Sequence, residues 1–86
     1  KGKKASVLIA DDSKSYRDLH RTFLENENFS TDIADDITQF VKKLYTNSYD
    51  LVMLDAEFQG LGTNVLQVMR SFRYFQNLPV IVTILY

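Results

Sequence analysis

The chain has 86 residues, ten of them basic and eleven acidic, with a net charge of −1 and 45% apolar side chains. This length allows one small domain, and the balanced charge gives no electrostatic reason to expect nucleic acid or an anionic membrane as a partner. The sequence has no cysteine and one histidine, which excludes a disulfide framework, a thiolate zinc site, a cysteine nucleophile and a multi-histidine metal site.

The chain begins with a predicted strand and a predicted helix. The run Ser6–Ala10 is short, apolar and bounded by polar residues, as in a buried strand of a parallel sheet. A helix is expected from about Ser15 to Asn26, where Ser15 and Asp18 resemble a capping box. Its apolar side chains fall on one face at helical spacing: Tyr16, Leu19, Phe23 and Leu24.

A second strand and helix follow. The strand is predicted at about Ser30–Ala34, and Asp36 is a plausible helix N-cap, with Gln39 three residues later. The helix has the clearest period in the chain, with apolar residues spaced i, i+3, i+4 and i+7: Ile37, Phe40, Val41 and Leu44.

The last predicted elements are a strand at Leu51–Leu54, a helix capped by Thr63 or Asn64, and a strand at Val80–Leu85. The apolar stripe of this third helix consists of Val65, Val68, Met69 and Phe72. Strands that alternate with helices in this way predict right-handed crossovers and a parallel α/β sheet.

Three carboxylates follow two of the predicted strands. Asp11 and Asp12 come directly after Ser6–Ala10, and Asp55 comes directly after Leu51–Leu54. Ligands of open α/β sheets bind at the carboxyl ends of the strands, so these acids are expected to converge. Their mutual repulsion would be relieved by a hard divalent cation with oxygen ligands.

The two acidic motifs resemble those of response-regulator receiver domains. The first reads Val-Leu-Ile-Ala-Asp-Asp-Ser over residues 7–13, and the second reads Tyr-Asp-Leu-Val-Met-Leu-Asp over residues 49–55. The spacing between them matches, as does Ala34-Asp35 after the second strand, and the likeness runs from about Lys4 to Tyr86. The resemblance implies a flavodoxin-like, doubly wound α/β fold with sheet order 2-1-3-4-5.

The resemblance also implies roles. In receiver domains an aspartate accepts a phosphoryl group from a sensor histidine kinase or a phosphotransfer protein, and Asp55 matches this phosphoacceptor. Asp11 and Asp12 match the pair that binds Mg²⁺, together with Asp55 itself and the backbone carbonyl of Glu57. These oxygen ligands suit Mg²⁺, and phosphoryl transfer depends on positioning and charge neutralisation. The expected function is therefore a phosphorelay receiver and not an enzyme, and the absence of cysteine fits a reducing cytoplasm.

The switch residue departs from the family pattern. Receivers carry Ser or Thr at the end of strand four, usually five residues after the proline that opens it. Counting from Pro79 gives Ile84, whereas Thr83 lies one residue earlier. Strand side chains alternate between faces, so this offset would turn the hydroxyl away. Either the switch is lost, or Thr83 serves through a bulge or a change of register, which we favour.

The likeness stops before the family's strand five. No lysine matches the strand-five lysine of receivers, so residues 1–86 are expected to form a single, partial receiver domain that lacks the last strand and helices. Strand four would then be a bare apolar edge, and such edges pair with another chain segment. We therefore expect a homodimer, a domain swap through strand four, or completion by a missing segment.

Two other functions remain open from the sequence. A pseudo-receiver would keep the fold and act only through protein contacts, which the shifted hydroxyl and an altered loop after Asp55 favour. A small Mg²⁺-dependent phosphohydrolase would use Asp55 as its nucleophile, although Glu57 is the only candidate for a nearby general acid and no substrate cap is present. In a fourth and simpler interpretation, Asp11 and Asp12 bind no ligand and only cap the helix that follows the first strand.

Overall fold

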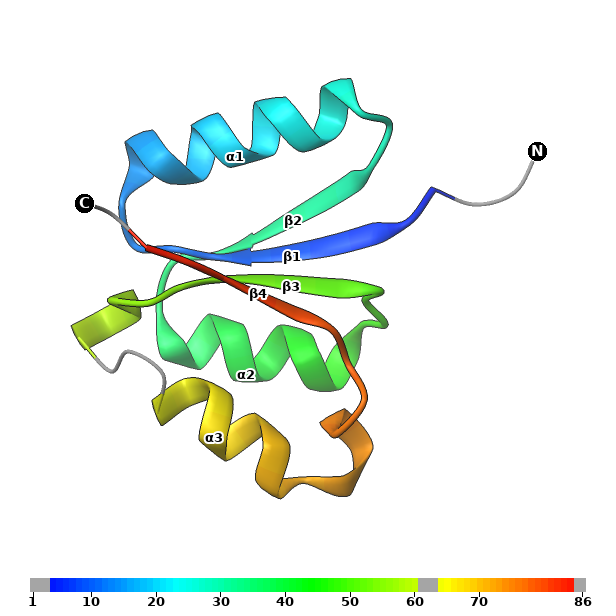
Figure 1. The fold of residues 1–86 in the computed structure, drawn as a ribbon, viewed down its shortest axis with the longest axis vertical. Helices are drawn as coiled ribbons and strands as arrows, with labels where there is room; N and C mark the ends of the chain where they lie inside the picture. The colour runs from blue at the N-terminus through cyan, green and yellow to red at the C-terminus, as the bar shows by residue number, and fades with distance from the viewer. Residues whose placement is uncertain (1–3, 61–63, 85–86) are drawn as a thin grey trace.

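Four parallel strands form one sheet in the order β2-β1-β3-β4, with helices on both faces, in a computed structural model that describes residues 4–60 and 64–84 (Figure 1). The elements in chain order are β1 Ser6–Ala10, α1 Lys14–Asn26, β2 Ser30–Ala34, α2 Ile37–Thr46, β3 Leu51–Asp55, the 3-10 turn η1 Phe58–Gly60, α3 Asn64–Ser71, the 3-10 turn η2 Arg73–Phe75 and β4 Val80–Thr83. The predicted alternation of strands and helices and the doubly wound parallel fold are confirmed.

The strands differ little from the sequence-based expectation. β1 and β2 have the predicted bounds, β3 includes Asp55, and β4 ends at Thr83. Part of the predicted fourth strand, Leu85, lies outside the described residues. β1 has a neighbouring strand on each side and helices above and below, so its residues 7–10 are fully buried.

Helix α1 starts one residue earlier than predicted, and the predicted capping box is wrong. Ser13 is the N-cap, with extended backbone angles and no side-chain cap hydrogen bond. Ser15 therefore lies inside the first turn, where its side chain cannot act as a cap. The Asp18 carboxylate instead accepts hydrogen bonds from Lys14 at 2.6 Å and Arg21 at 3.2 Å.

The apolar face of α1 is buried only in part. Leu24 packs against Val7 and Ile9 of the sheet, whereas Leu19 and Phe23 are 61% and 63% exposed. Figure 1 explains the difference, because α1 lies alone on its face of the sheet while α2 and α3 lie side by side on the other. The predicted stripe is present, but most of it has no neighbour among the described residues.

Helix α2 begins as the sequence predicts. The Asp36 carboxylate accepts a hydrogen bond from the backbone N–H of Gln39 at 2.8 Å. The Gln39 side chain in turn accepts one from the backbone N–H of Asp35 at 3.2 Å. This reciprocal arrangement satisfies two backbone donors at the helix start. Phe40 and Leu44 then point into the core.

Helix α3 is described from Asn64, and the alternative cap Thr63 lies outside the described residues. Two members of its predicted stripe, Val65 and Met69, are buried, whereas Val68 and Phe72 are exposed. Only half of the predicted apolar stripe of α3 is therefore buried in the core.

The side chain of Arg70 holds the connection between α3 and β4 in place. Its Nη1 atom donates to the carbonyl oxygens of Phe75, Gln76 and Leu78 at 2.8, 3.2 and 2.7 Å. These bonds satisfy the carbonyls of η2 and the turn after it, which precede the first residue of β4, Val80.

Candidate metal centre

The carboxylates of Asp11, Asp12 and Asp55 lie together at the carboxyl edge of the sheet. One oxygen from each can be chosen so that all three lie within 4.8 Å of one another. β1 delivers the first two and the neighbouring strand β3 delivers the third, because Ala10, the last residue of β1, pairs with Leu54, and Asp55 is the next and last residue of β3. In Figure 1 the strands run from right to left, and this edge lies on the left.

Backbone donors hold two of these carboxylates. The N–H of Ser13 donates to Asp11 Oδ1 at 2.9 Å, and the N–H of Gln59 donates to Asp12 Oδ2 at 3.1 Å. The second bond joins the loop after β1 to the loop after β3. The sequence analysis missed Gln59, whose φ of 53° lies in the left-handed region. Glutamine has no preference for that region, so the sequence offers no signal for this contact.

The electrostatics of the cluster centre on Asp11, which is only 4% exposed. Burial raises the pKa of the Asp11 carboxyl; the Ser13 hydrogen bond lowers it, and the negative charge of Asp55 raises it again, with a net upward shift. His20 opposes the shift slightly, and its own Nδ1 is buried without a hydrogen-bond partner among the described residues. Burial and the neighbouring carboxylates therefore outweigh the groups that favour the charged form of Asp11.

The donor set fits Mg²⁺. The three groups are hard oxygen donors, and Mg²⁺ binds such oxygens octahedrally at about 2.0–2.1 Å, so two directly bound oxygens are at most roughly 4.2 Å apart. The three oxygens lie within 4.8 Å of one another, which is close to this limit. Asp12 is the exposed member of the cluster.

Glu57 lies in the loop after β3 and is exposed. Its carboxylate is not part of the cluster of three. Its backbone carbonyl accepts a hydrogen bond from the N–H of Gly60 at 2.8 Å. A carbonyl oxygen has a second lone pair, so this bond leaves one position for a metal ion.

Thr83 pairs with Asp55 across the β3–β4 ladder. The pairing runs without interruption from Val52 with Val80 to this last pair, so the bulge or register change expected from the sequence is not present. Paired residues of parallel strands project on the same face of a sheet, so Thr83 points to the same side as Asp55. Ile84 lies beyond the end of β4 and is exposed. Thr83 thus reaches the position beside Asp55 four residues after Pro79, one fewer than the family's usual count.

The sequence profile of the response regulator receiver domain matches residues 7–84. The chain belongs to this family. The receiver domain is similar to the transcriptional regulatory protein ResD of Bacillus subtilis, with 33% identity over 75 residues that cover 87% of this chain and 30% of ResD. It is also 32% identical to the response regulator ArlR of Staphylococcus saprophyticus over 88% of this chain and 34% of ArlR. The chain thus spans about a third of the length of these curated relatives.

Solved structures agree with this assignment. The signal receiver domain of a DNA binding response regulator protein from Colwellia psychrerythraea superposes with a TM-score of 0.84 at 30% identity, over 94% of this chain and 68% of that one. A sensor protein from Polaromonas gives a TM-score of 0.88 over 95% and 66% of the two chains, and at 18% identity it shows the fold alone. Receiver domains are signalling modules of two-component systems and interact with histidine kinases or phosphotransfer proteins. No helix in the described ranges is both long and apolar enough to cross a membrane.

Proposed function

We propose that this receiver domain accepts a phosphoryl group on Asp55 from a histidine kinase or a phosphotransfer protein, with Mg²⁺ bound at the acidic edge. The observation that carries the proposal is the convergence of three carboxylates from two strands within 4.8 Å. Asp11, Asp12, Asp55 and the carbonyl of Glu57 would hold the ion. The ion would neutralise charge as the phosphoryl group approaches the carboxylates.

The surrounding residues suit this transfer. A carboxylate oxygen of Asp55 forms a bond to phosphorus while the bond between phosphorus and its donor atom breaks, and the donor leaves with that electron pair. The N–H groups of Ser13 and Gln59 hold the other two carboxylates in position. Thr83, beside Asp55 in the ladder, can donate its hydroxyl to an oxygen of the transferred group. Asp55 and Thr83 would thereby couple phosphorylation to the position of β4.

Acetyl phosphate with Mg²⁺ tests the proposal, with intact mass as the readout. We expect a mass increase of about 80 Da, the difference for one phosphoryl group, that requires Mg²⁺ and is absent from Asp55→Asn. The matched control is Asp35→Asn, because Asp35 follows the neighbouring strand β2 and is exposed but lies outside the cluster. This control should react as the unaltered protein does.

The same experiment separates the alternatives. A protein that takes up no phosphoryl group and does not respond to Mg²⁺ would be a pseudo-receiver that acts through protein contacts. Sustained turnover of acetyl phosphate far beyond one equivalent would instead indicate a phosphohydrolase. Labelling that persists in Asp55→Asn would reject Asp55 as the acceptor.

We also propose that residues 1–86 act in the cytoplasm as part of one receiver domain whose β4 edge pairs with a further strand. Among the described strands, β4 has β3 as its only neighbour, and Ile81 at its centre is 48% exposed. The further strand would come from a second copy, by simple pairing or a domain swap, or from additional polypeptide. Light scattering over a range of concentrations tests the first two sources, and a monomer at all concentrations would rule them out.

A further inference from the structure

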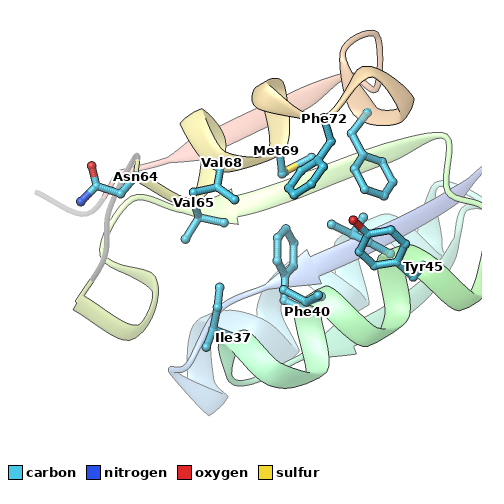
Figure 2. A pocket seen from close by; sticks show the side chains of 11 residues that line it. Ile37, Phe40, Tyr45, Asn64, Val65, Val68, Met69 and Phe72 are labelled. Atoms are coloured by element: carbon cyan, nitrogen blue, oxygen red, sulfur yellow. The ribbon is translucent and has the colours of Figure 1, made fainter.

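An apolar groove lies between α2 and α3, on the sheet face opposite α1 (Figure 2). Its volume is about 370 Å³. Its floor includes Phe40, Val65 and Met69, which are all buried in the core. Figure 2 shows Ile37 and Asn64 at one end and Tyr45 and Phe72 at the other. The groove therefore follows the length of both helices.

The walls of the groove are apolar side chains that the fold leaves exposed. Val41 and Tyr45 of α2 are 45% and 59% exposed, and Val68 and Phe72 on the α3 side are 58% and 47% exposed. Each pair is spaced i, i+4, so it forms a ridge along its side of the groove. The Tyr45 ring meets the Phe72 and Phe75 rings edge to face at centroid distances of 6.5 and 5.4 Å, which joins the two sides at one end. Two apolar ridges with a gap between them match the surface of an amphipathic helix.

The charged side chains of the helical elements that form the groove are all basic, although the N-cap Asp36 precedes Ile37 at one end. The elements that form it, residues 37–46 and 64–76, contain four basic residues and no acidic one. Lys43 is paired with Asp32 at 2.7 Å, and Arg70 is occupied by backbone carbonyls. The other two, Lys42 and Arg73, are exposed and have no ion pair within residues 4–60 and 64–84. They directly follow Val41 and Phe72, the two wall residues on either side of the groove.

We propose that the α2–α3 groove binds an acidic amphipathic helix of a partner protein. Apolar residues of that helix at i, i+3, i+4 and i+7 enter the groove between Val41 and Val68. Its carboxylates lie along the exposed sides near Lys42 and Arg73. This surface is separate from the acidic edge, so binding does not require Asp55 or Mg²⁺.

A second copy of the chain fits the groove less well. Apart from the two helices that form the groove, the described helix with an exposed apolar stripe is α1, with Tyr16, Leu19 and Phe23 at i, i+3 and i+7. That helix carries the basic residues Lys14, Arg17 and Arg21 against two acids. Asp18 is already paired with Lys14 and Arg21, and Glu25 at the far end of the helix accepts a hydrogen bond from Thr31. Basic side chains would then meet the basic surroundings of the groove, which opposes docking.

Fluorescence anisotropy with three labelled peptides of about 16 residues, or roughly four helical turns, tests the proposal. The first peptide has a leucine stripe at i, i+3, i+4 and i+7 with glutamates on its other faces. The second has the same stripe with lysines, and the third has the composition of the first in scrambled order. We expect the acidic stripe peptide to bind at least about tenfold more tightly than either of the others. Its advantage over the lysine peptide should shrink as salt is added.

Variants of the protein locate the binding surface. Val41→Gln with Val68→Gln should weaken binding about tenfold or more, since it removes apolar contact from both sides of the groove. Both side chains are substantially exposed, so the fold should be retained, which circular dichroism checks. Leu19→Gln is the matched control, an exposed leucine of α1 on the other face, and should not change binding. Lys42→Gln with Arg73→Gln should remove most of the preference for glutamate over lysine.

Three results would overturn the proposal. Equal binding of the stripe and scrambled peptides would show that the groove does not recognise a helix. Unchanged binding by the Val41→Gln, Val68→Gln variant would place the peptide elsewhere. Self-association of the unlabelled protein that both this variant and Leu19→Gln abolish would identify the occupant as a second copy.

Discussion

Asp11, which directly follows β1, and Asp32, which lies in the neighbouring strand β2, are both at least partly buried, and the pKa values of their carboxyl groups shift in opposite directions. Burial alone would raise the pKa of Asp32, but hydrogen bonds from Lys43 and Tyr49 outweigh it, and the pKa lies below its usual value. Those bonds are 2.7 and 2.6 Å long. Burial raises the pKa of Asp11, a hydrogen bond from Ser13 only partly compensates, and the charge of Asp55 adds to the rise.

Under the proposed function, this difference separates a carboxylate with a structural role, Asp32, from one with a metal-binding role, Asp11. The Lys43 ammonium and the Tyr49 hydroxyl both donate to Asp32. These bonds join β2 to α2 and to the turn that precedes β3. At Asp11 the neighbouring carboxylates of Asp55 and Asp12 add negative charge instead, which is the environment that a bound cation would stabilise. Four predictions test this contrast.

The largest expected effect is stabilisation by Mg²⁺. At a free Mg²⁺ concentration of about one hundred times Kd, the free energy of unfolding should rise by roughly 2.7 kcal/mol. Asp11→Asn should lose most of this gain, because it removes the buried carboxylate of the cluster, whereas Asp32→Asn should keep it. Urea denaturation with and without Mg²⁺ measures the gain. An equal loss in both variants would remove the distinction between the two sites.

The same two variants should change stability in opposite directions when no metal is present. Asp11→Asn should raise the free energy of unfolding by roughly 1 kcal/mol at neutral pH, since it relieves repulsion while the amide oxygen can still accept from Ser13. Asp32→Asn should lower it by roughly 1 kcal/mol, a modest value because the Asp32 and Lys43 side chains are 39% and 31% exposed. Urea denaturation in the presence of a chelator gives both values. A destabilised Asp11→Asn would contradict the electrostatic interpretation.

The pH dependence of stability should also differ in sign. The Asp11 pKa in the folded protein lies above the unfolded value of 3.8, so its contribution to stability falls as the pH rises through the range that begins near 3.8. The Asp32 pKa lies below 3.8, so its contribution is present above 3.8 and is lost as the pH falls through the folded value. Stability measured against pH for each variant, minus that of the unaltered protein, should therefore give slopes of opposite sign. Slopes of the same sign for the Asp11 and Asp32 variants would contradict opposite pKa shifts at these two residues.

The smallest effect is expected for Tyr49→Phe. The variant loses the hydroxyl that donates to Asp32 and should be destabilised by about 0.5–1 kcal/mol. Burial, together with the carboxylate that accepts from it, raises the pKa of Tyr49, so the hydroxyl remains a donor throughout the neutral range. Mg²⁺ titration should give the same affinity as the unaltered protein, and a changed affinity would connect the two sites.

The sequence predicted those features that depend on local patterns. The apolar runs predicted the bounds of β1 and β2. The acids at the ends of β1 and β3 predicted the cluster, because parallel strands bring their carboxyl ends to one edge of the sheet. The cap at Asp36 was also predicted correctly, since all of its parts lie within a few residues.

Features that depend on distant contacts were not predicted. The contact of Gln59 with Asp12 requires a left-handed backbone at a residue with no preference for it. The position of Thr83 depends on where β4 pairs with β3, which no local pattern specifies. The exposure of Leu19 depends on what covers that face of the sheet, and a periodic stripe cannot report this. In the first two cases the deciding partner lies far away in the sequence.

The three carbonyl contacts of Arg70 have a consequence at the opposite end of β4. They fasten the turn from which that strand departs, so they help to set which side chain arrives next to Asp55. A slip of one position would replace the hydroxyl of Thr83 with the isopropyl group of Val82 or the butyl group of Ile84. We therefore expect the loss of Arg70, which is remote from the acids, to impair signalling although this residue contacts none of the proposed metal ligands.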